Sequence, residues 1–147
     1  MTTTALGSDK LTVPQLIEQL KARHRSARLQ AAAVLGRLGR KARPAVPALI
    51  EALQDDDEHM RRLAALALGD LGADSPAAVA ALMEALHDKH PGVRRRAAVA
   101  LGEIGAGAAA AVRDLVQAVE DTDQGVGRMA AWASEMIGRA VRRQKAA

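Results

Sequence analysis

Residues 46–53 read VPALIEAL, and closely similar stretches recur at a fixed interval of 33 residues. The copy before it is VPQLIEQL at residues 13–20, and later copies begin at Val79 and Val112. A second motif recurs at the same interval. It reads LGRLG at residues 35–39, then LGDLG and LGEIG, and ends in the altered copy SEMIG. A period of this size predicts a solenoid, in which each unit buries its apolar face by stacking on its neighbours.

Each repeated unit is predicted to hold two helices, which we call the A helix and the B helix. The apolar side chains of residues 46–53 share one helical face. Pro47 suits a first helical turn, because backbone N–H groups in that turn have no hydrogen-bond partner within the helix and the N–H that proline lacks is not needed there. The apolar pattern restarts over residues 60–71 and stops at Gly72, where we expect a left-handed cap. Nothing in the pattern predicts a strand.

The period divides the chain into one domain with a short tail. A chain of 147 residues can bury about two thirds of its unfolded surface in a single domain. In the last unit Gly127, Ser134 and Glu135 replace the Arg, Leu and Gly of the other copies, so we expect a capping repeat with none after it. The predicted parts are a flexible tail at residues 1–10, a solenoid over 11–147, and repeats at about 11–43, 44–76, 77–109 and 110–142.

The composition limits the chemistry and the location of the protein. Phe, Tyr and Cys are absent and Trp132 is the only aromatic residue, so no disulfide framework forms and the core consists of aliphatic side chains. The first ten residues lack the basic and apolar stretches of a signal peptide, and no apolar run approaches membrane-spanning length. We therefore expect a cytoplasmic protein with no membrane partner.

Residues 88–105 read DKHPGVRRRAAVALGEIG, and this unit resembles the short HEAT-like repeat, the type also seen in phycobilisome lyases. Ankyrin repeats share the period but carry a Thr-Pro-Leu-His signature that is absent here, and tetratricopeptide repeats need aromatic residues that this chain lacks. The resemblance implies an all-α fold, a right-handed α-solenoid of four two-helix repeats. It also implies that the B helices line the inner, concave surface and the A helices the outer one.

Two rows of arginine recur at the start of the B helices. Arg28, Arg61 and Arg94 keep the period, and each follows an acidic or polar turn between the two helices. In HEAT-like repeats this arrangement resembles a ladder of Asp and Arg that links one repeat to the next, so we expect these three to be structural. The neighbouring row lies about 160° from the core stripe and is expected to point into the inner groove; it consists of Arg62, Arg95 and Arg128.

An apolar row lies one helical turn beyond the second arginine row. It consists of Ala33, Leu66, Val99 and Trp132, each four residues after Leu29 or an arginine. Trp and Arg are enriched in interface hot spots, so the two rows together predict a site for a protein partner with acidic groups. The predicted partner-binding residues are Arg62, Leu66, Arg95, Val99, Arg128 and Trp132. The alternative is that Leu66 and Val99 pack between neighbouring B helices while Trp132 covers the solenoid end beneath Val141.

Charge is unevenly distributed along the chain, although the net charge is only +4. Residues 21–43 hold eight basic and no acidic residues, residues 44–92 hold three basic and nine acidic ones, and residues 93–147 hold nine basic and six acidic ones. Such a chain could bind an anionic partner at its N-terminal repeat, associate end to end with another copy, or simply present a solvated surface. The sequence argues against nucleic acid, because no aromatic residues alternate with the basic ones and the acidic middle would repel phosphate.

The parts of an enzyme are missing from the sequence. Only His87 and His90 are clustered in a way that suggests metal ligands, and no Gly-rich phosphate loop occurs. We therefore predict no catalytic residues, no cofactor and no metal, and a non-enzymatic scaffold or adaptor that binds a protein in the inner groove. Two alternatives stay open: an accessory subunit of a tetrapyrrole-lyase-like enzyme, which the family resemblance suggests, and nucleic-acid binding through the basic N-terminal repeat.

Overall fold

The structure is a computed structural model that describes residues 11–147, so the tail expected at residues 1–10 lies outside the described part. Within residues 11–147 the regular elements are all helices, and the predicted all-helical solenoid is confirmed. The helices form consecutive A and B pairs: α1 (Val13–Gln19) with α2 (Arg25–Leu38), α3 (Val46–Ala52) with α4 (Glu58–Leu71), α5 (Pro76–Ala85) with α6 (Pro91–Ile104), and α7 (Val112–Ala118) with α8 (Gln124–Ala146).

Local side-chain capping sets where four of the eight α-helices of residues 11–147 begin. The side chains of Thr12, Asp57, Ser75 and Asp123 each accept a hydrogen bond from a backbone N–H in the first turn of the helix that follows. Helix α8 runs on to Ala146, so the basic end of the chain extends the last helix. These caps satisfy donors that have no partner inside their own helix.

The ends of the B helices differ from the prediction. Gly72 has a φ of −89°, so the left-handed cap expected there is wrong. The equivalent Gly39 and Gly105 do have positive φ, at 60° and 73°. After each of these two glycines the chain forms a 3₁₀ helix that the sequence did not predict, η3 (Gly39–Ala45) and η4 (Gly105–Ala111). After Gly72 the Ser75 cap and Pro76 start α5 instead.

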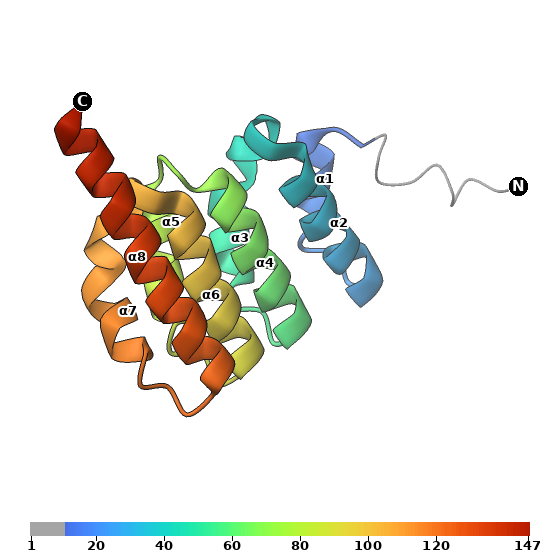
Figure 1. Cartoon of the computed structure of the whole chain (residues 1–147). Helices are drawn as coiled ribbons and strands as arrows, with labels where there is room; N and C mark the ends of the chain where they lie inside the picture. The colour runs from blue at the N-terminus through green and yellow to red at the C-terminus, as the bar shows by residue number, and fades with distance from the viewer. Residues whose placement is uncertain (1–10) are drawn as a thin grey trace, which may run out of the picture.

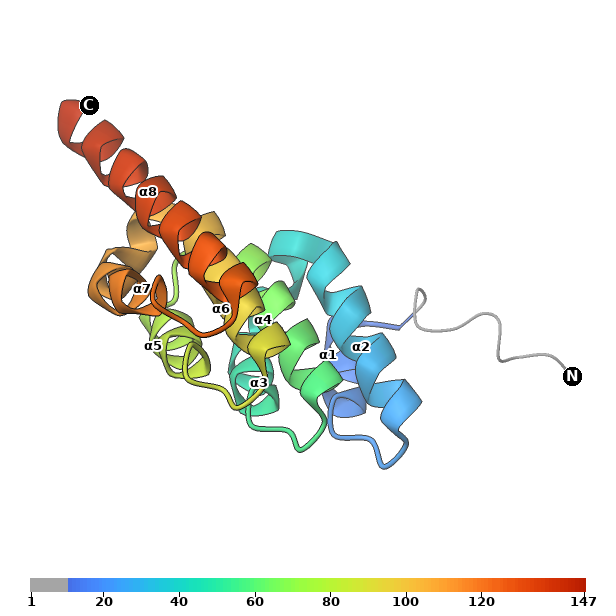
Figure 2. The same cartoon turned by 60° about the horizontal axis from the view of Figure 1, so that its bottom comes forward.

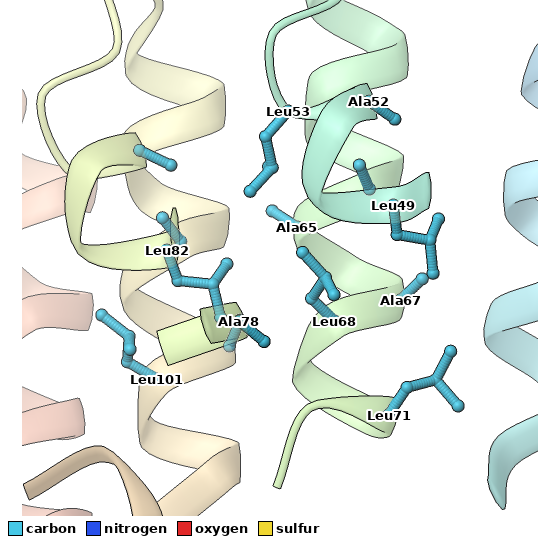
Figure 3. Packing of buried hydrophobic residues seen from close by; sticks show 14 of the residues in the cluster. Leu49, Ala52, Leu53, Ala65, Ala67, Leu68, Leu71, Ala78, Leu82 and Leu101 are labelled. Atoms are coloured by element: carbon cyan, nitrogen blue, oxygen red, sulfur yellow. The ribbon is translucent and has the colours of Figure 1, made fainter. Parts of the chain in front are cut away.

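The B helices lie side by side in one layer, and the A helices form a second layer behind them (Figures 1 and 2). One leucine from each A helix is fully buried between the layers, at Leu16, Leu49, Leu82 and Leu115. Leu68 and Leu101 reach the same core from the B helices (Figure 3). The 33-residue period of the sequence is therefore the period of the core.

Successive B helices approach each other closely through glycine. A methyl group placed on Gly102 would lie 3.0 Å from Cα of Ala133 and 2.5 Å from Cζ3 of Trp132. One placed on Gly69 would lie 3.1 Å from Cα of Ala100, whereas one on Gly36 would meet its nearest atom, in Ala67, at 3.5 Å. The B helices pack along their length while the A helices touch one another little. The B face is therefore the tighter, inner side of the stack, and we call it the inner groove.

The glycine contacts predict opposite effects for one substitution at two equivalent positions. Gly36→Ala adds a methyl group in ordinary contact and removes a helix-destabilising glycine, so we expect the free energy of unfolding to rise by up to about 1 kcal/mol. Gly102→Ala forces the indole and the α8 backbone to move, so we expect a loss of about 1–3 kcal/mol. Urea unfolding followed by circular dichroism measures both. Equal effects at the two sites would contradict the packing described above.

Candidate functional site

The first arginine row forms the ladder predicted from the sequence. Arg61 donates from Nε and Nη2 to the two carboxylate oxygens of Asp88, at 2.8 and 3.0 Å. Arg94 repeats the same bidentate contact with Asp121, at 2.9 and 3.0 Å. Arg28 makes a looser rung, with its Nε 3.5 Å from the carboxylate of Asp55. Each rung thus joins a B helix to the turn of the next repeat.

Each ladder arginine also holds the turn of its own repeat. Nη1 of Arg61 donates to the carbonyl oxygens of Asp55 and Asp56, and Arg28 and Arg94 make the equivalent contacts. The acidic partner in turn accepts a backbone N–H two residues on, as Asp88 does from His90. Arg61 is buried, at 6% exposed, and Arg28 and Arg94 are half-buried, so this row belongs to the framework of the solenoid.

Hydrogen bonding lowers the pKa of two ladder carboxyls, those of Asp88 and Asp121. For Asp121 the main cause is the hydrogen bond from Arg94, with burial acting in the opposite direction. For Asp88 burial raises the pKa, but hydrogen bonds from Arg61 and from the His90 backbone outweigh it, so the net shift is downward. These carboxylates stay ionised well into the acid range.

The second arginine row lies on the surface of the inner groove. Arg95 and Arg128 are exposed and Arg62 is half-buried. Nη1 of Arg62 lies over the first turn of α6, 3.3 Å from where a methyl group on Gly92 would stand, and Arg95 lies in the same way over Gly125. In the part of the chain that the structure describes, no hydrogen bond or ion pair is found for these three guanidinium groups. We call Arg62, Arg95 and Arg128 the arginine row.

The apolar strip of Ala33, Leu66, Val99 and Trp132 also reaches the surface. Ala33 is exposed, Leu66 and Val99 are half-buried, and Trp132 is 37% exposed. The indole of Trp132 lies back against Gly102 of α6, where Cζ3 fills the space above the glycine. This position of the indole differs from the predicted alternative, in which Trp132 covers the solenoid end beneath Val141. The strip is therefore partly packed between repeats and partly available to a partner.

A hollow of about 130 Å³ opens in the strip between α2 and α4. It exists because Ala33 is small where the next repeats carry Leu66, Val99 and Trp132, and because Gly36 and Ala67 are in looser contact than their counterparts. Its walls are apolar except for Arg37 and Asp70; the lining residues are Ala32, Ala33, Gly36, Arg37, Leu63, Leu66, Ala67 and Asp70. Sequence reasoning missed this hollow.

Two acidic residues form a third row that sequence reasoning also missed. Asp70 and Glu103 are exposed and stand four residues after Leu66 and Val99, hence one turn further along the same helix face. The carboxylate of Glu103 leans over Gly69 at the junction of α4 and α6. Burial, and then the charge of Asp70, raise the pKa of Glu103, while Arg96 acts in the opposite direction. We call Asp70 and Glu103 the carboxylate row; the four-residue spacing was the signal that would have revealed it.

Four of the eight basic residues at 21–43 are paired with acidic residues of the second repeat. Their ion pairs are Lys21 with Glu51 at 3.7 Å, Arg28 with Asp55, Arg25 with Asp57, and Arg43 with Asp74. The hydrogen bond from Arg25 lowers the pKa of Asp57 to about 2. The alternating charge seen in the sequence is therefore used in part between neighbouring repeats.

Two of the four histidines, His59 and His90, contact acidic side chains, and both lie near Glu58. Nε2 of His90 contacts the carboxylate of Glu58, and Nδ1 of His59 lies 3.2 Å from Asp57. Within residues 11–147 no group of three or more His, Cys, Asp or Glu side chains is placed to hold a metal ion. Over the same residues, none of the helices has the length and apolar content to cross a bilayer.

Adjacent arginines provide a matched test of the ladder. Arg61→Ala leaves Asp88 without its bidentate partner in a largely buried site, so we expect the free energy of unfolding to fall by about 3 kcal/mol or more. Arg62→Ala removes a side chain that makes no such pair, so we expect a loss of about 1 kcal/mol or less. Chemical denaturation of both variants tests the assignment, and a larger loss for Arg62→Ala would reverse the roles of the two rows.

The lowered carboxyl pKa values predict a loss of stability in acid. A carboxylate whose pKa is depressed by folding adds stability that is complete above the unfolded-state value of about 3.9 and disappears as pH falls through the folded-state value, which is about 2 for Asp57. Asp88→Asn should therefore be less stable than the wild type at pH 7 and lose less stability between pH 5 and pH 2. Urea unfolding across this range measures the slope. Asp56→Asn leaves every rung intact and is the control; equal slopes for Asp88→Asn and the wild type would refute the prediction.

Comparison with known proteins agrees with the repeat pattern. A family profile described as HEAT repeats matches residues 13–102 and 81–146. A search of curated proteins gave no significant match. The structure of the complex of CpcE and CpcF of phycocyanin lyase from Nostoc sp. PCC7120 contains a similar chain, with a TM-score of 0.73 and 31% identity over 95% of this chain and 58% of that one. This chain thus spans little more than half of that relative.

Two further solved structures share the fold at lower identity. An engineered protein gives a TM-score of 0.67 and 21% identity over 95% of this chain and 69% of its own. A designed armadillo repeat protein in complex with peptide (KR)4 gives 0.65 and 19% identity over 89% and 69%. Because the HEAT-repeat profile accounts for nearly all of the described residues, the chain belongs to the HEAT-repeat family.

Proposed function

We propose that the protein is a non-enzymatic adaptor that holds a protein partner in its inner groove. The observation that carries this proposal is the pairing of two rows on one face: three guanidinium groups with no acidic partner in the described chain, beside a partly exposed apolar strip that ends in Trp132. Arginine and tryptophan give large contact energies when a partner excludes water from them. The other periodic arginines of the B helices, Arg28, Arg61 and Arg94, are already used in the ladder.

The proposed mechanism is binding to a preformed surface. Glycine contacts fix the spacing of the B helices, and the ladder fixes the position of each helix relative to the next turn. A partner then meets side chains whose backbone needs little rearrangement, which lowers the entropic cost of association. Acidic groups of the partner would accept bidentate hydrogen bonds from Arg62, Arg95 and Arg128, and the strip would supply apolar contact.

Similar solenoids support a binding role without identifying the partner. The designed armadillo repeat protein of similar fold is in complex with a peptide, so a helical solenoid of this size can hold one. The similarity to a chain of phycocyanin lyase supports a second candidate, an accessory subunit of a tetrapyrrole-lyase-like enzyme. Nucleic acid is a weaker candidate, because Lys21, Arg25, Arg28 and Arg43 are paired with carboxylates and offer phosphate little free charge.

Site-specific cross-linking tests the groove directly. A photo-reactive residue is placed at Val99 in the groove and, as the control, at exposed Ala80 on the outer helix α5. Both proteins are irradiated in lysate of the source organism, and cross-linked chains are identified by mass spectrometry. We expect one protein partner to cross-link at position 99 and not at position 80. Arg95→Glu with Arg128→Glu should reduce that product at least tenfold, because reversed charge repels acidic groups.

The controls separate the candidates. Arg113→Glu with Arg143→Glu changes the net charge equally at exposed sites away from the groove rows and should leave the cross-link unchanged. A product that carries a tetrapyrrole would favour the lyase-like candidate over a simple adaptor. Cross-linking at position 80 with none at position 99 would place the partner on the outer face and refute the groove proposal.

A further inference from the structure

We infer that the inner groove accepts an amphipathic α-helix of the partner that has acidic side chains along one edge, basic side chains along the other, and one apolar side chain inserted between α2 and α4. This inference rests on the proposed function and names the chemistry of its partner. It depends on three features of the B face that lie parallel to one another: the arginine row, the apolar strip with its hollow, and the carboxylate row.

The width of the groove fits a helix. Arg62, Leu66 and Asp70 follow one another at four-residue steps on one face of α4, so the arginine row and the carboxylate row are about 12 Å apart along the B helices. An α-helix with its side chains is about 10–12 Å across, so one lying across the B helices reaches both rows at once. An extended strand that points its alternate side chains to the two edges of the groove has no side chain left to enter the hollow between them.

The charges of the two rows require opposite charges on the two edges of the partner. The carboxylate row has no ion pair in the described part of the chain, and burial, followed by the charge of nearby Asp70, raises the pKa of Glu103. An acidic group brought to this row would add to that repulsion, whereas a lysine or arginine would relieve it. The arginine row, one helix width away, instead requires acidic side chains on the partner.

The hollow gives the partner helix its register. A volume of about 130 Å³ with mainly apolar walls is similar to the roughly 150 Å³ that holds a benzene-sized group in a protein interior, so one leucine-sized or phenyl side chain fits it. At the equivalent junction between α4 and α6 the Glu103 carboxylate lies over Gly69, and at the junction between α6 and α8 the Trp132 indole lies over Gly102. The first junction is therefore where an anchor side chain from outside can enter.

Synthetic helical peptides test the inference. Four peptides share one apolar stripe of leucines and differ at the edges, which are Glu on one and Lys on the other, Glu on both, Lys on both, or uncharged on both. Binding to the wild-type chain is measured by fluorescence anisotropy at physiological salt. We expect the Glu/Lys peptide to bind most tightly, with about two- to fivefold lost for each pair that is removed.

Variants of the chain assign the effect to particular residues. Asp70→Asn with Glu103→Gln should weaken the Glu/Lys peptide and strengthen the peptide with Glu on both edges, whereas Glu84→Gln with Glu120→Gln alters the net charge equally and should do neither. Ala33→Leu places in the first repeat the residue found at Leu66 in the second. It should fill the hollow and weaken the Glu/Lys peptide at least fivefold without lowering the thermal unfolding temperature; Ala80→Leu on the outer face is its control.

The failure of this inference can be told apart from failure of the proposed function. Equal affinity of the wild type for the Glu/Lys peptide and for the peptide with Glu on both edges would show that the carboxylate row does not bind the basic edge of the peptide. The inference would also be overturned if the Glu/Lys peptide bound the wild type no more tightly than the uncharged peptide does. It would be overturned as well if the Glu/Lys peptide bound Ala33→Leu as tightly as it binds the wild type. In each case the cross-link at Val99 still decides independently whether a protein occupies the groove in another form.

Discussion

The contact between a glycine of each B helix and an alanine of the next B helix sets the spacing on which the inner groove depends. Where this contact is tight, at Gly69 and Gly102, neighbouring helices leave no room for a side chain between them, and Glu103 and Trp132 are displaced over the junction toward the surface. Where it is looser, at Gly36, a hollow remains. A small difference in backbone separation thus decides which junction is closed and which is open.

The ladder complements this packing with a polar constraint. Helix contacts through glycine and alanine permit sliding, because small side chains offer few interlocking surfaces, whereas a bidentate pair between guanidinium and carboxylate has one favourable geometry. Since each arginine also binds the carbonyl groups of its own turn, two successive turns are held by one side chain. Each repeat in such a stack is stabilised by its contacts with the nearest neighbouring repeats, so the loss of one rung affects the repeats on both sides of it.

Much of the fold could be predicted from the sequence because the period, the apolar spacing and the Asp and Arg pairs are local or strictly repeated features. The ladder of Arg61 and Arg94 follows from that repetition, as do the surface positions of Arg95 and Arg128. The hollow could not be predicted, because it depends on a difference of a few tenths of an ångström in helix separation as well as on the size of Ala33. The positive φ of Gly39 and the negative φ of Gly72 occur in closely similar local motifs, LGRLG and LGDLG, so the segment that follows each glycine decides its conformation.

The altered last repeat has a consequence for self-assembly. Glu135 stands where the other repeats have Gly36, Gly69 and Gly102, and its carboxylate pairs with Arg139 on the outer side of α8, 2.5 Å away. A second copy stacked head to tail on this side would have to bury that ion pair against the first B helix and would find Gly127 in place of a ladder arginine. Head-to-tail contacts that do not close on themselves generate filaments. A single carboxylate in place of a glycine therefore gives the last B helix a face that does not match the glycine contacts made between the other repeats.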